Sequence, residues 1–189
     1  GSTFFATLGA LPVRAAELPA GAGALTFPQG VASGDPRQDS VMLWTRAVPA
    51  GGAASAPMLL QLSDSEEFST VLLEELLTTD AASDFTVRAF VDGLASGRHY
   101  YYRFLGGDGS VSRTGRTMTA RALDDERPVN IAFASCQSYE QGYYGSWARL
   151  ITDGRQAAVL FLDLDGFKKV NDTAGHEAGS SLTHCVSCF

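Results

Sequence analysis

Between Leu25 and Ala120, short runs of alternating or apolar residues are separated by turn-forming residues. The runs are rich in β-branched and aromatic side chains, and Pro, Gly and Asp bound them, as is typical of strands. No run in this region has the apolar spacing of a convincing long amphipathic helix. We therefore expect a mainly β region, with strands at residues 40–46, 57–63, 85–91, 100–105 and 111–119.

Residues 64–79, DSEEFSTVLLEELLTT, fit two kinds of secondary structure. Their Leu and Glu content favours a helix, whereas Val71, Leu73 and the closing pair of threonines suit a strand. Because the neighbouring runs on both sides are β-like, we expect a strand here as well.

The run from Val91 to Phe104 indicates how two of these strands are connected. Leu94 is followed six residues later by Tyr100, where an alternating strand begins. Side chains alternate between the two faces of a strand. The first face has Tyr100, Tyr102 and Phe104, and the second has Tyr101, Arg103 and Leu105. The spacing resembles the corner between strands E and F of fibronectin type III and immunoglobulin-like sandwiches, in which the tyrosine hydroxyl bonds back to the preceding turn.

His99 is expected to face solvent rather than to bind a metal, because no second His, Cys or acidic cluster accompanies it.

The pattern changes after a polar linker at residues 121–128. Residues 129–136 form an almost continuous apolar run, as expected of a buried parallel strand. A helix at 141–154, a second buried strand at 157–165 and a short helix at 166–179 would follow. Alternating strands and helices are typical of α/β folds. The fold class we expect is an immunoglobulin- or fibronectin-III-like β-sandwich followed by a short, incomplete α/β segment.

Residues 1–24 have the character of an export signal. They are apolar and small, and the run VRAA at residues 13–16 matches a signal-peptide cleavage site. We therefore expect a signal-peptide remnant and linker, and an exported protein, periplasmic or extracellular, with the Tat pathway as one route. The alternative is a cloning scar at Gly1-Ser2 followed by an unstructured arm.

Composition and charge exclude several kinds of partner. The net charge is -7, and all twelve arginines lie at or before Arg155, scattered along the chain. Such a surface offers no basic patch for nucleic acid. No apolar run approaches the roughly 20 residues needed to cross a bilayer. The three cysteines are Cys136, Cys185 and Cys188, so no disulfide scaffold holds the first 135 residues. We expect a monomer.

Cys136 is the first candidate for a chemical role. It ends the apolar run 129–136, and the carboxyl ends of strands in open α/β sheets are where ligands and metals bind. A thiolate at such a point can ligate a transition metal. Taken alone, a single buried cysteine is more often a small apolar core residue.

Four separated motifs resemble, in order, those of PhoD-like phosphatases. They are FPQGVASGDPRQDSVMLWTR at residues 27–46, HYYYRF at 99–104, GRTMTA at 115–120 and VNIAFASCQSYEQGYYGSW at 129–147. The resemblance implies an Ig-like N-terminal domain at 25–120 that leads into the start of a calcineurin-type metallophosphatase core at 129–155. It also implies that Cys136 is an iron ligand, and that full-length relatives hydrolyse small phosphoester substrates with iron and calcium.

The chain departs from this family after residue 150. The family's second core strand ends in a GDYIYE-type motif with a metal-binding Asp and Tyr. Here Asp163 ends the corresponding strand, 27 residues after Cys136, and no Tyr follows. Asp163 would be the metal ligand of the second strand, but a binuclear site cannot be completed. We therefore expect no bound metal and no phosphatase activity.

Residues 157–179, AAVLFLDLDGFKKVNDTAGHEAG, resemble instead the start of a GGDEF diguanylate cyclase domain. The resemblance implies that Asp163 binds magnesium, that Asn171 contacts guanine and that Lys168 contributes to nucleotide binding. A carboxylate at a strand end suits magnesium, which prefers oxygen ligands. Where the family has another Asp, this chain has Ser180, and the GGDEF signature is absent from the sequence. We expect no cyclase activity from this segment.

The segments we expect are therefore 1–24, 25–120, 121–128, 129–155, 156–180 and an unmatched tail at 181–189. In that tail Cys185, Cys188 and His184 resemble half of a zinc site, but no second pair is present.

Three functions remain open: an N-terminal fragment of an exported phosphatase, a cyclase fragment with an unrelated front end, and a non-enzymatic β-sandwich binding module. The export signal and the longer resemblance favour the phosphatase. The abrupt join near residues 150–156 suggests a chimeric reading frame.

Overall fold

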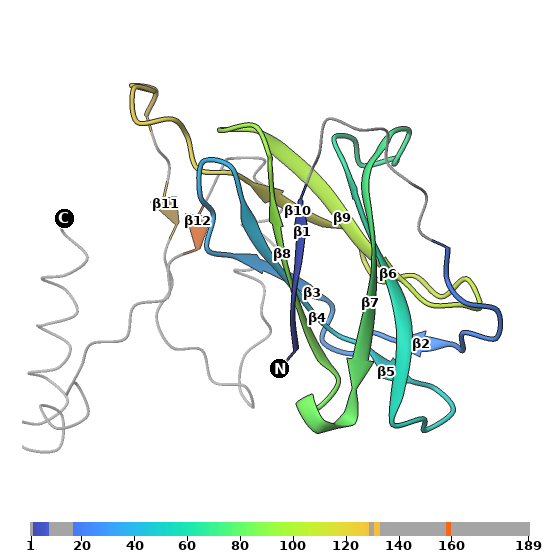
Figure 1. Cartoon of the computed structure of the whole chain (residues 1–189). Helices are drawn as coiled ribbons and strands as arrows, with labels where there is room; N and C mark the ends of the chain where they lie inside the picture. Colours follow the sequence, from blue (N-terminus) through green and yellow to red (C-terminus); the bar gives the residue numbers. More distant parts are fainter. Residues whose placement is uncertain (1, 8–16, 129–130, 133–157, 160–189) are drawn as a thin grey trace, which may run out of the picture. The chain divides into compact units, whose positions relative to one another are not determined.

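The chain divides into two compact units, Gly1–Asp125 and Glu126–Phe189. The structure, a computed structural model, describes residues 2–7, 17–128, 131–132 and 158–159 (Figure 1). The boundary between the units falls inside the polar run at residues 121–128.

The described part of the first unit contains two four-stranded sheets and a two-stranded one. The first sheet has the order β1-β8-β4-β3, which are Ser2–Thr7, Thr86–Asp92, Val41–Arg46 and Val31–Gly34. The second has the order β10-β9-β6-β7, which are Gly115–Met118, His99–Leu105, Ser55–Ser63 and Val71–Asp80. The two-stranded sheet joins β2, Leu25–Thr26, to β5, Val48–Pro49. All of these neighbours are antiparallel except β1 and β8, which are parallel.

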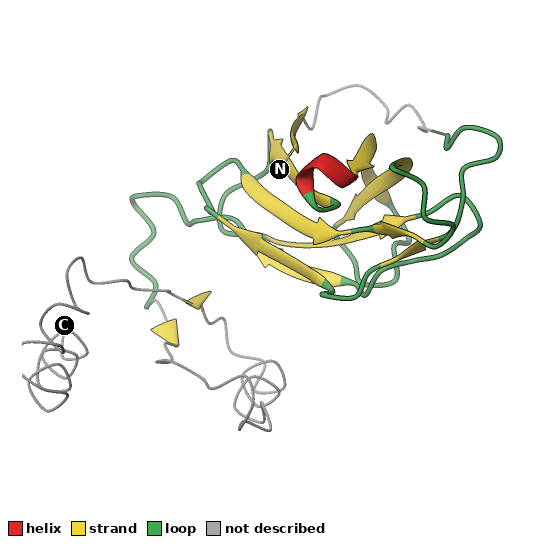
Figure 2. Ribbon diagram, turned by 90° about the horizontal axis from the view of Figure 1, so that it is seen from below, coloured by secondary structure: helices red, strands yellow, loops and turns green. Residues whose placement is uncertain are grey.

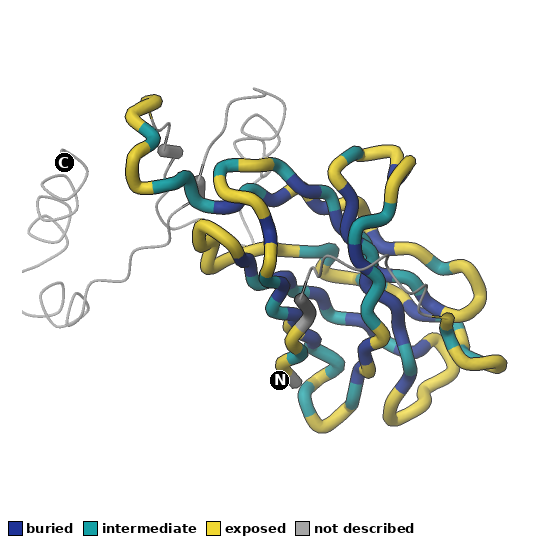
Figure 3. Tube along the Cα trace, turned by 45° about the horizontal axis from the view of Figure 1, so that its top comes forward, coloured by how far each residue is buried: buried dark blue, intermediate teal, exposed yellow. Residues whose placement is uncertain are grey.

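Alternation of buried and half-buried residues shows why the strands stack into a β-sandwich (Figure 3). In β4 every second residue is buried, and β8 and β9 follow the same pattern. The inward side chains of the two large sheets meet in one apolar core. Those of the first sheet include Val41, Leu43, Val87, Ala89 and Val91, and those of the second include Met58, Leu60, Leu62, Leu77 and Phe104. A period-two pattern gives each sheet one apolar face, and the two apolar faces bury each other when the sheets pack together.

The structure confirms the alternation expected around the aromatic run in β9. The side chains of Tyr100, Tyr102 and Phe104 are buried, whereas their neighbours on the other face are half-buried. The ambiguous run at 64–79 is also resolved, since its second half forms β7. Helix is almost absent from the described residues, where η1, Ala81–Ser83, is the single helical element (Figure 2). The mainly β fold class is thereby confirmed.

Two expectations about strand limits were wrong. A continuous strand was expected at 111–119, but the structure has a bridge at Val111 and then β10 from Gly115. Ser112 interrupts the ladder, because its hydroxyl accepts a hydrogen bond from the Phe104 N–H at 3.0 Å. In addition, residues 2–7 form strand β1, although the sequence suggested no strand before Leu25.

In the second unit the structure describes residues 126–128 and two short strands, β11, Ile131–Ala132, and β12, Ala158–Val159. They pair in parallel, with Ile131 opposite Ala158. This is the relation that the α/β pattern predicted for the runs 129–136 and 157–165. The helices expected at 141–154 and 166–179 lie outside the described residues.

Within the described part of the chain, no helix has the length and apolar character needed to cross a lipid bilayer.

Candidate functional site

The four residues that the sequence singled out for chemistry lie outside the described residues. They are Cys136, Asp163, Lys168 and Asn171. The same holds for the zinc-like tail with Cys185 and Cys188. The site has therefore to be sought first in the sandwich, which carries most of the phosphatase-like motifs.

Metal ligands do not gather in the described ranges, where no group of three or more His, Cys, Asp or Glu residues could hold an ion. His99 begins β9 and is half-buried. Burial lowers the pKa of His99, the positive charge of Arg116 lowers it further, and a hydrogen bond with the backbone of Thr117 opposes both effects. The lowered pKa favours the neutral form of the imidazole. His99 belongs to a sheet strand and not to a cluster of acidic residues.

One end of the sandwich concentrates the polar contacts between motifs that are distant in sequence. We call it the exit end, and define it by residues 35–40, 93–98 and 119–120, because the polar linker starts at residue 121. The chain passes there from β8 in the first sheet to β9 in the second. The Tyr100 hydroxyl accepts a hydrogen bond from the Ala95 N–H at 2.9 Å. This confirms the bond to the preceding turn that the Leu94–Tyr100 spacing predicted.

Thr119 holds the same turn from the other side. Its buried hydroxyl donates to the carbonyl of Ala95 at 2.7 Å and accepts from the N–H of Arg98 at 3.1 Å. The Thr119 N–H donates to the Arg98 carbonyl at 3.1 Å. A turn packed against a buried side chain avoids the cost of leaving its N–H and carbonyl groups unsatisfied when they are paired in this way.

Backbone hydrogen bonds also fix the loop at 35–40 at the exit end. The Leu94 N–H donates to the Asp39 carbonyl, and the Ala120 N–H donates to the Arg37 carbonyl, both at 2.8 Å. The Arg37 side chain extends into solvent and pairs with Asp35 at 3.2 Å. Two motif segments, 35–40 and 119–120, and the turn at 93–98 are therefore fixed together where the chain leaves the sandwich.

Tyr102 connects the same motifs through the core. Its side chain is only 2% exposed, and its hydroxyl is hydrogen-bonded to the side chain of Ser33 in the other sheet. Burial raises the pKa of Tyr102 to about 12, and the Ser33 bond opposes that rise. Gly115 on β10 makes room for the ring, since a Cβ at this position would overlap it. The hydroxyl is neutral at ordinary pH and serves as a link between sheets.

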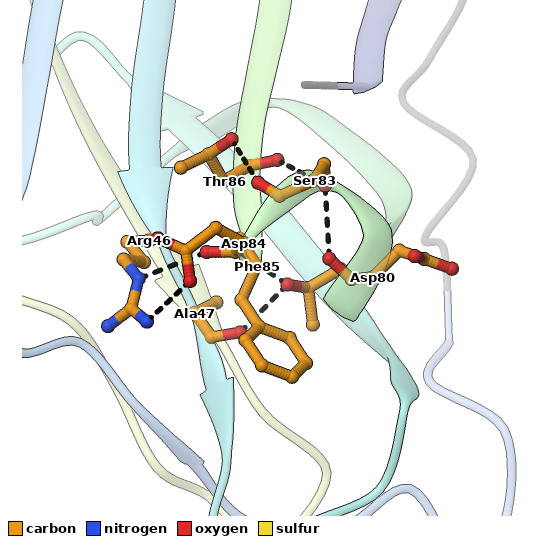
Figure 4. Close-up of polar contacts among 8 residues, drawn as sticks. Arg46, Ala47, Asp80, Ser83, Asp84, Phe85 and Thr86 are labelled. Atoms are coloured by element: carbon orange, nitrogen blue, oxygen red, sulfur yellow. Dashed lines mark hydrogen bonds and ion pairs between the residues drawn. The ribbon is translucent and has the colours of Figure 1, made fainter.

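The opposite end of the sandwich, which we call the far end, is held by charge (Figure 4). It contains the crossing from β7 through η1 to β8. Arg46 approaches Asp84 twice, with Nη2 at 2.8 Å from the carboxylate and Nε at 3.0 Å from the carbonyl. Asp84 and Phe85 have φ values of 51° and 58°, in the left-handed region that non-glycine residues rarely adopt. The Thr79 hydroxyl, which is buried, lies 2.8 Å from the Ala47 carbonyl and 3.0 Å from that of Phe85.

A third polar group lies on the outer face of the second sheet. The Arg103 guanidinium is stacked on the Phe68 ring at 4.0 Å, and its Nε donates to Gln61 at 2.8 Å. Gln61 in turn donates to Glu74 at 2.6 Å. The guanidinium is thus held in place by contacts within the sheet. In all three places the described polar side chains complete the fold, and they form no nucleophile and base pair.

Sequence reasoning missed Ser33, Gly115 and Thr119 as residues that matter individually. Each lies inside a motif that the sequence did offer, since Ser33 belongs to ASGDP and the other two belong to GRTMTA. The motifs could be recognised in the sequence, but the roles of these three residues could not, because their contacts join residues far apart in the chain.

Two protein families match different parts of the chain. The model of the PhoD-like phosphatase N-terminal domain matches residues 13–121. The model of the diguanylate cyclase GGDEF domain matches residues 138–186. The first match begins before Leu25, where the sequence analysis placed the start of the domain.

Curated relatives divide in the same way. Alkaline phosphatase D of Bacillus subtilis (strain 168) is 35% identical over 157 residues, which are 79% of this chain and 26% of that protein. A bifunctional diguanylate cyclase/cyclic di-GMP phosphodiesterase, MucR, of Pseudomonas aeruginosa is 62% identical over 32 residues, 17% of this chain and 5% of that protein. The chain thus spans about a quarter of the length of the phosphatase that it matches.

A solved structure matches the fold as well. The structure of PhoD superposes with a TM-score of 0.64 at 34% sequence identity, over 71% of this chain and 27% of that one.

Proposed function

We propose that this chain, which belongs to the family of the PhoD-like phosphatase N-terminal domain, supplies the non-catalytic β-sandwich of an alkaline phosphatase D. The observation that carries the proposal is the exit end, where the loop at 35–40, the Tyr100 corner and Thr119 are joined by hydrogen bonds. The hydrogen bonds of these polar groups fix the point at which the chain leaves the sandwich. The arrangement suits a domain that presents the next part of the chain, and offers no reacting group.

Phosphoester hydrolysis would belong to the metallophosphatase part that comes after the sandwich in full-length relatives. There iron and calcium would supply Lewis acids that polarise phosphoryl oxygens. The ligands that this chain would offer are Cys136 and, in the place of the second-strand Asp, Asp163. Both lie outside the described residues, so no catalytic step is assigned to them. With two of the ligands of a binuclear site, the chain is expected to be inactive.

The proposed setting is that of an exported enzyme. The apolar run before the cleavage-like VRAA at 13–16 supports export to the periplasm or the medium. The partner of the full-length protein would be a small phosphoester, and the chain itself would be a monomer.

Hydrolysis of bis(p-nitrophenyl) phosphate by the full chain, purified with iron and calcium supplied, tests this proposal. No turnover above that of the same metals in buffer is expected, and no stoichiometric iron. The matched control is Cys136→Ser, which removes the proposed iron ligand and leaves the described sandwich unchanged. Turnover together with stoichiometric iron, both lost in Cys136→Ser, would overturn the assignment of a non-catalytic role.

A second function is favoured by the family match at residues 138–186. In this function Asp163 would bind magnesium, while Asn171 and Lys168 would contact a guanine nucleotide. Binding of a guanine nucleotide is the part of this function that these three residues would provide. Calorimetry with GTP and magnesium tests it. Binding that Asp163→Asn abolishes would support this second function, and heat that is the same for both chains would exclude it.

A further inference from the structure

Strand β1 is attached to the sandwich in a way that differs from all the other described strands of the first unit. It pairs in parallel with β8, from Ser2 opposite Val87 to Thr7 opposite Asp92. Figure 1 shows β1 (dark blue) running alongside β8, at the edge of the first sheet. Two parallel neighbours cannot be joined by a tight turn, so no hairpin holds β1 on its partner. It lies on the edge as a segment added to an otherwise complete sheet.

The edge that β1 covers belongs to a strand with a fully buried face. The side chains of Val87, Ala89 and Val91 are 0% exposed and form part of the main core. The other edge of β8 is already paired with β4. Without β1, the outer edge of β8 would present a row of unpaired N–H and carbonyl groups, which is a template for another strand.

The two aromatic residues of β1 make unequal contributions. Phe4 is opposite Ala89 and packs against the core cluster. Phe5 is opposite Phe90 on the outer face, with an edge-to-face ring contact at 5.8 Å, but it remains 76% exposed. The contribution of an apolar side chain to binding grows with the apolar area that it removes from water. Phe4 therefore anchors the segment, and Phe5 adds little.

We propose that the outer edge of β8 is a strand-acceptor site, and that the segment Ser2–Thr7 is its ligand. Backbone pairing along β8 gives the segment its affinity, and the place taken by Phe4 gives it specificity, as in other complexes formed by strand addition. The segment of the same chain fills the site, and the same segment from a second copy fills it when the first is absent. Cleavage in the run VRAA at 13–16 would remove the segment and leave the site open. This inference does not depend on the phosphatase assignment.

Amide hydrogen exchange of the full chain carrying Phe4→Asp tests the proposal. Alternate N–H groups of a strand point to its two neighbours, so β8 reports separately on β1 and on β4. The amides facing β1 should exchange at least about tenfold faster, while those facing β4 stay protected. Phe5→Ser is the matched control and should leave both sets within about twofold of the wild type, because Phe5 is exposed. Phe4→Ala serves as a milder second variant in case the aspartate disturbs the core.

A peptide of sequence STFFAT with blocked ends then tests occupancy by a second copy. A short tether gives an effective concentration of about millimolar, so the free peptide is added at about that level. It should restore protection in the Phe4→Asp chain, and the peptide STFDAT should not. Unchanged protection in both Phe4 variants would overturn the proposal. Dimerisation of the Phe4→Asp chain that STFFAT fails to reverse would also overturn it, because the edge would then prefer another copy of β8.

Discussion

The two ends of the sandwich both hold a crossing between the sheets, but they do so with different polar groups. At the exit end the side chains that hold the crossing, Thr119 and Tyr100, are neutral and buried. At the far end a charged pair, Arg46 and Asp84, lies beside the buried hydroxyl of Thr79, and the Asp84 side chain is 78% exposed.

This difference predicts where the stability of the domain resides. Exposed ion pairs contribute little to the free energy of unfolding, because water and salt screen them. Buried neutral groups are costly to leave without a partner. The exit end should therefore be the more sensitive to mutation and the less sensitive to salt. That suits its place beside the linker.

The largest effect is expected from Thr119→Val, a change that keeps the shape of the side chain. It removes the partner of both the Ala95 carbonyl and the Arg98 N–H, and two orphaned groups cost about 2–4 kcal/mol of unfolding free energy. Urea unfolding measures the loss. Thr119→Ser retains the hydroxyl and should recover most of the stability, whereas equal losses in the two variants would show that the methyl group matters rather than the hydrogen bonds.

The next effect concerns pH and Tyr102. Its pKa is raised from 10.0 to about 12 in the folded chain, so the folded state disfavours the ionised phenol. The contribution is fully present below the unfolded pKa of 10.0, and is lost as the pH rises from there to about 12. A loss of about 2–3 kcal/mol is expected across that interval, from about 1.4 kcal/mol per pKa unit. Unfolding of the wild type and of Tyr102→Phe is compared at several alkaline pH values, and parallel curves would contradict the prediction.

A smaller effect is expected at the far end from Thr79→Val. The Ala47 carbonyl loses the partner that it has in Thr79, but the Phe85 carbonyl still accepts from the Ala47 N–H at 3.0 Å. With one group orphaned instead of two, the cost should be about 1–2 kcal/mol. The comparison of the two ends fails if this variant proves less stable than Thr119→Val in the same urea measurement.

The smallest effect is expected from Asp84→Asn. Asparagine tolerates the left-handed conformation at this position, so the change removes mainly the charge that faces Arg46. The loss should be about 0.5 kcal/mol or less at low salt, and should vanish near 1 M salt. Thermal unfolding in a salt series measures it. A loss above about 1.5 kcal/mol that persists in high salt would mean that the far end depends on this pair as strongly as the exit end depends on Thr119.

Much of the first unit could be predicted because its signals are local. The period-two pattern of residues 40–46 and 100–105 reports directly that one face of each strand is buried. The resemblance of the run from Leu94 to Tyr100 to a known sandwich corner was sufficient to predict the bond to the preceding turn, since both partners lie within a few residues. The candidate site was less accessible. The residues named for metal and nucleotide binding fall outside the described ranges, and their roles remain predictions.

The sequence by itself determined most strands of the two large sheets, the aromatic face of β9 and the family, because these depend on spacing and on motif order along the chain. Only the tertiary structure decided that Ser33 contacts Tyr102, that Thr119 holds the turn at Ala95, and that residues 2–7 complete a sheet. Each of these joins residues far apart in the chain, and a polar or glycine residue carries no local sign of its partner. The run at 2–7 shows this most directly. Its small and aromatic residues suit both an export signal and an edge strand, and only the structure shows that they pair with the edge of β8.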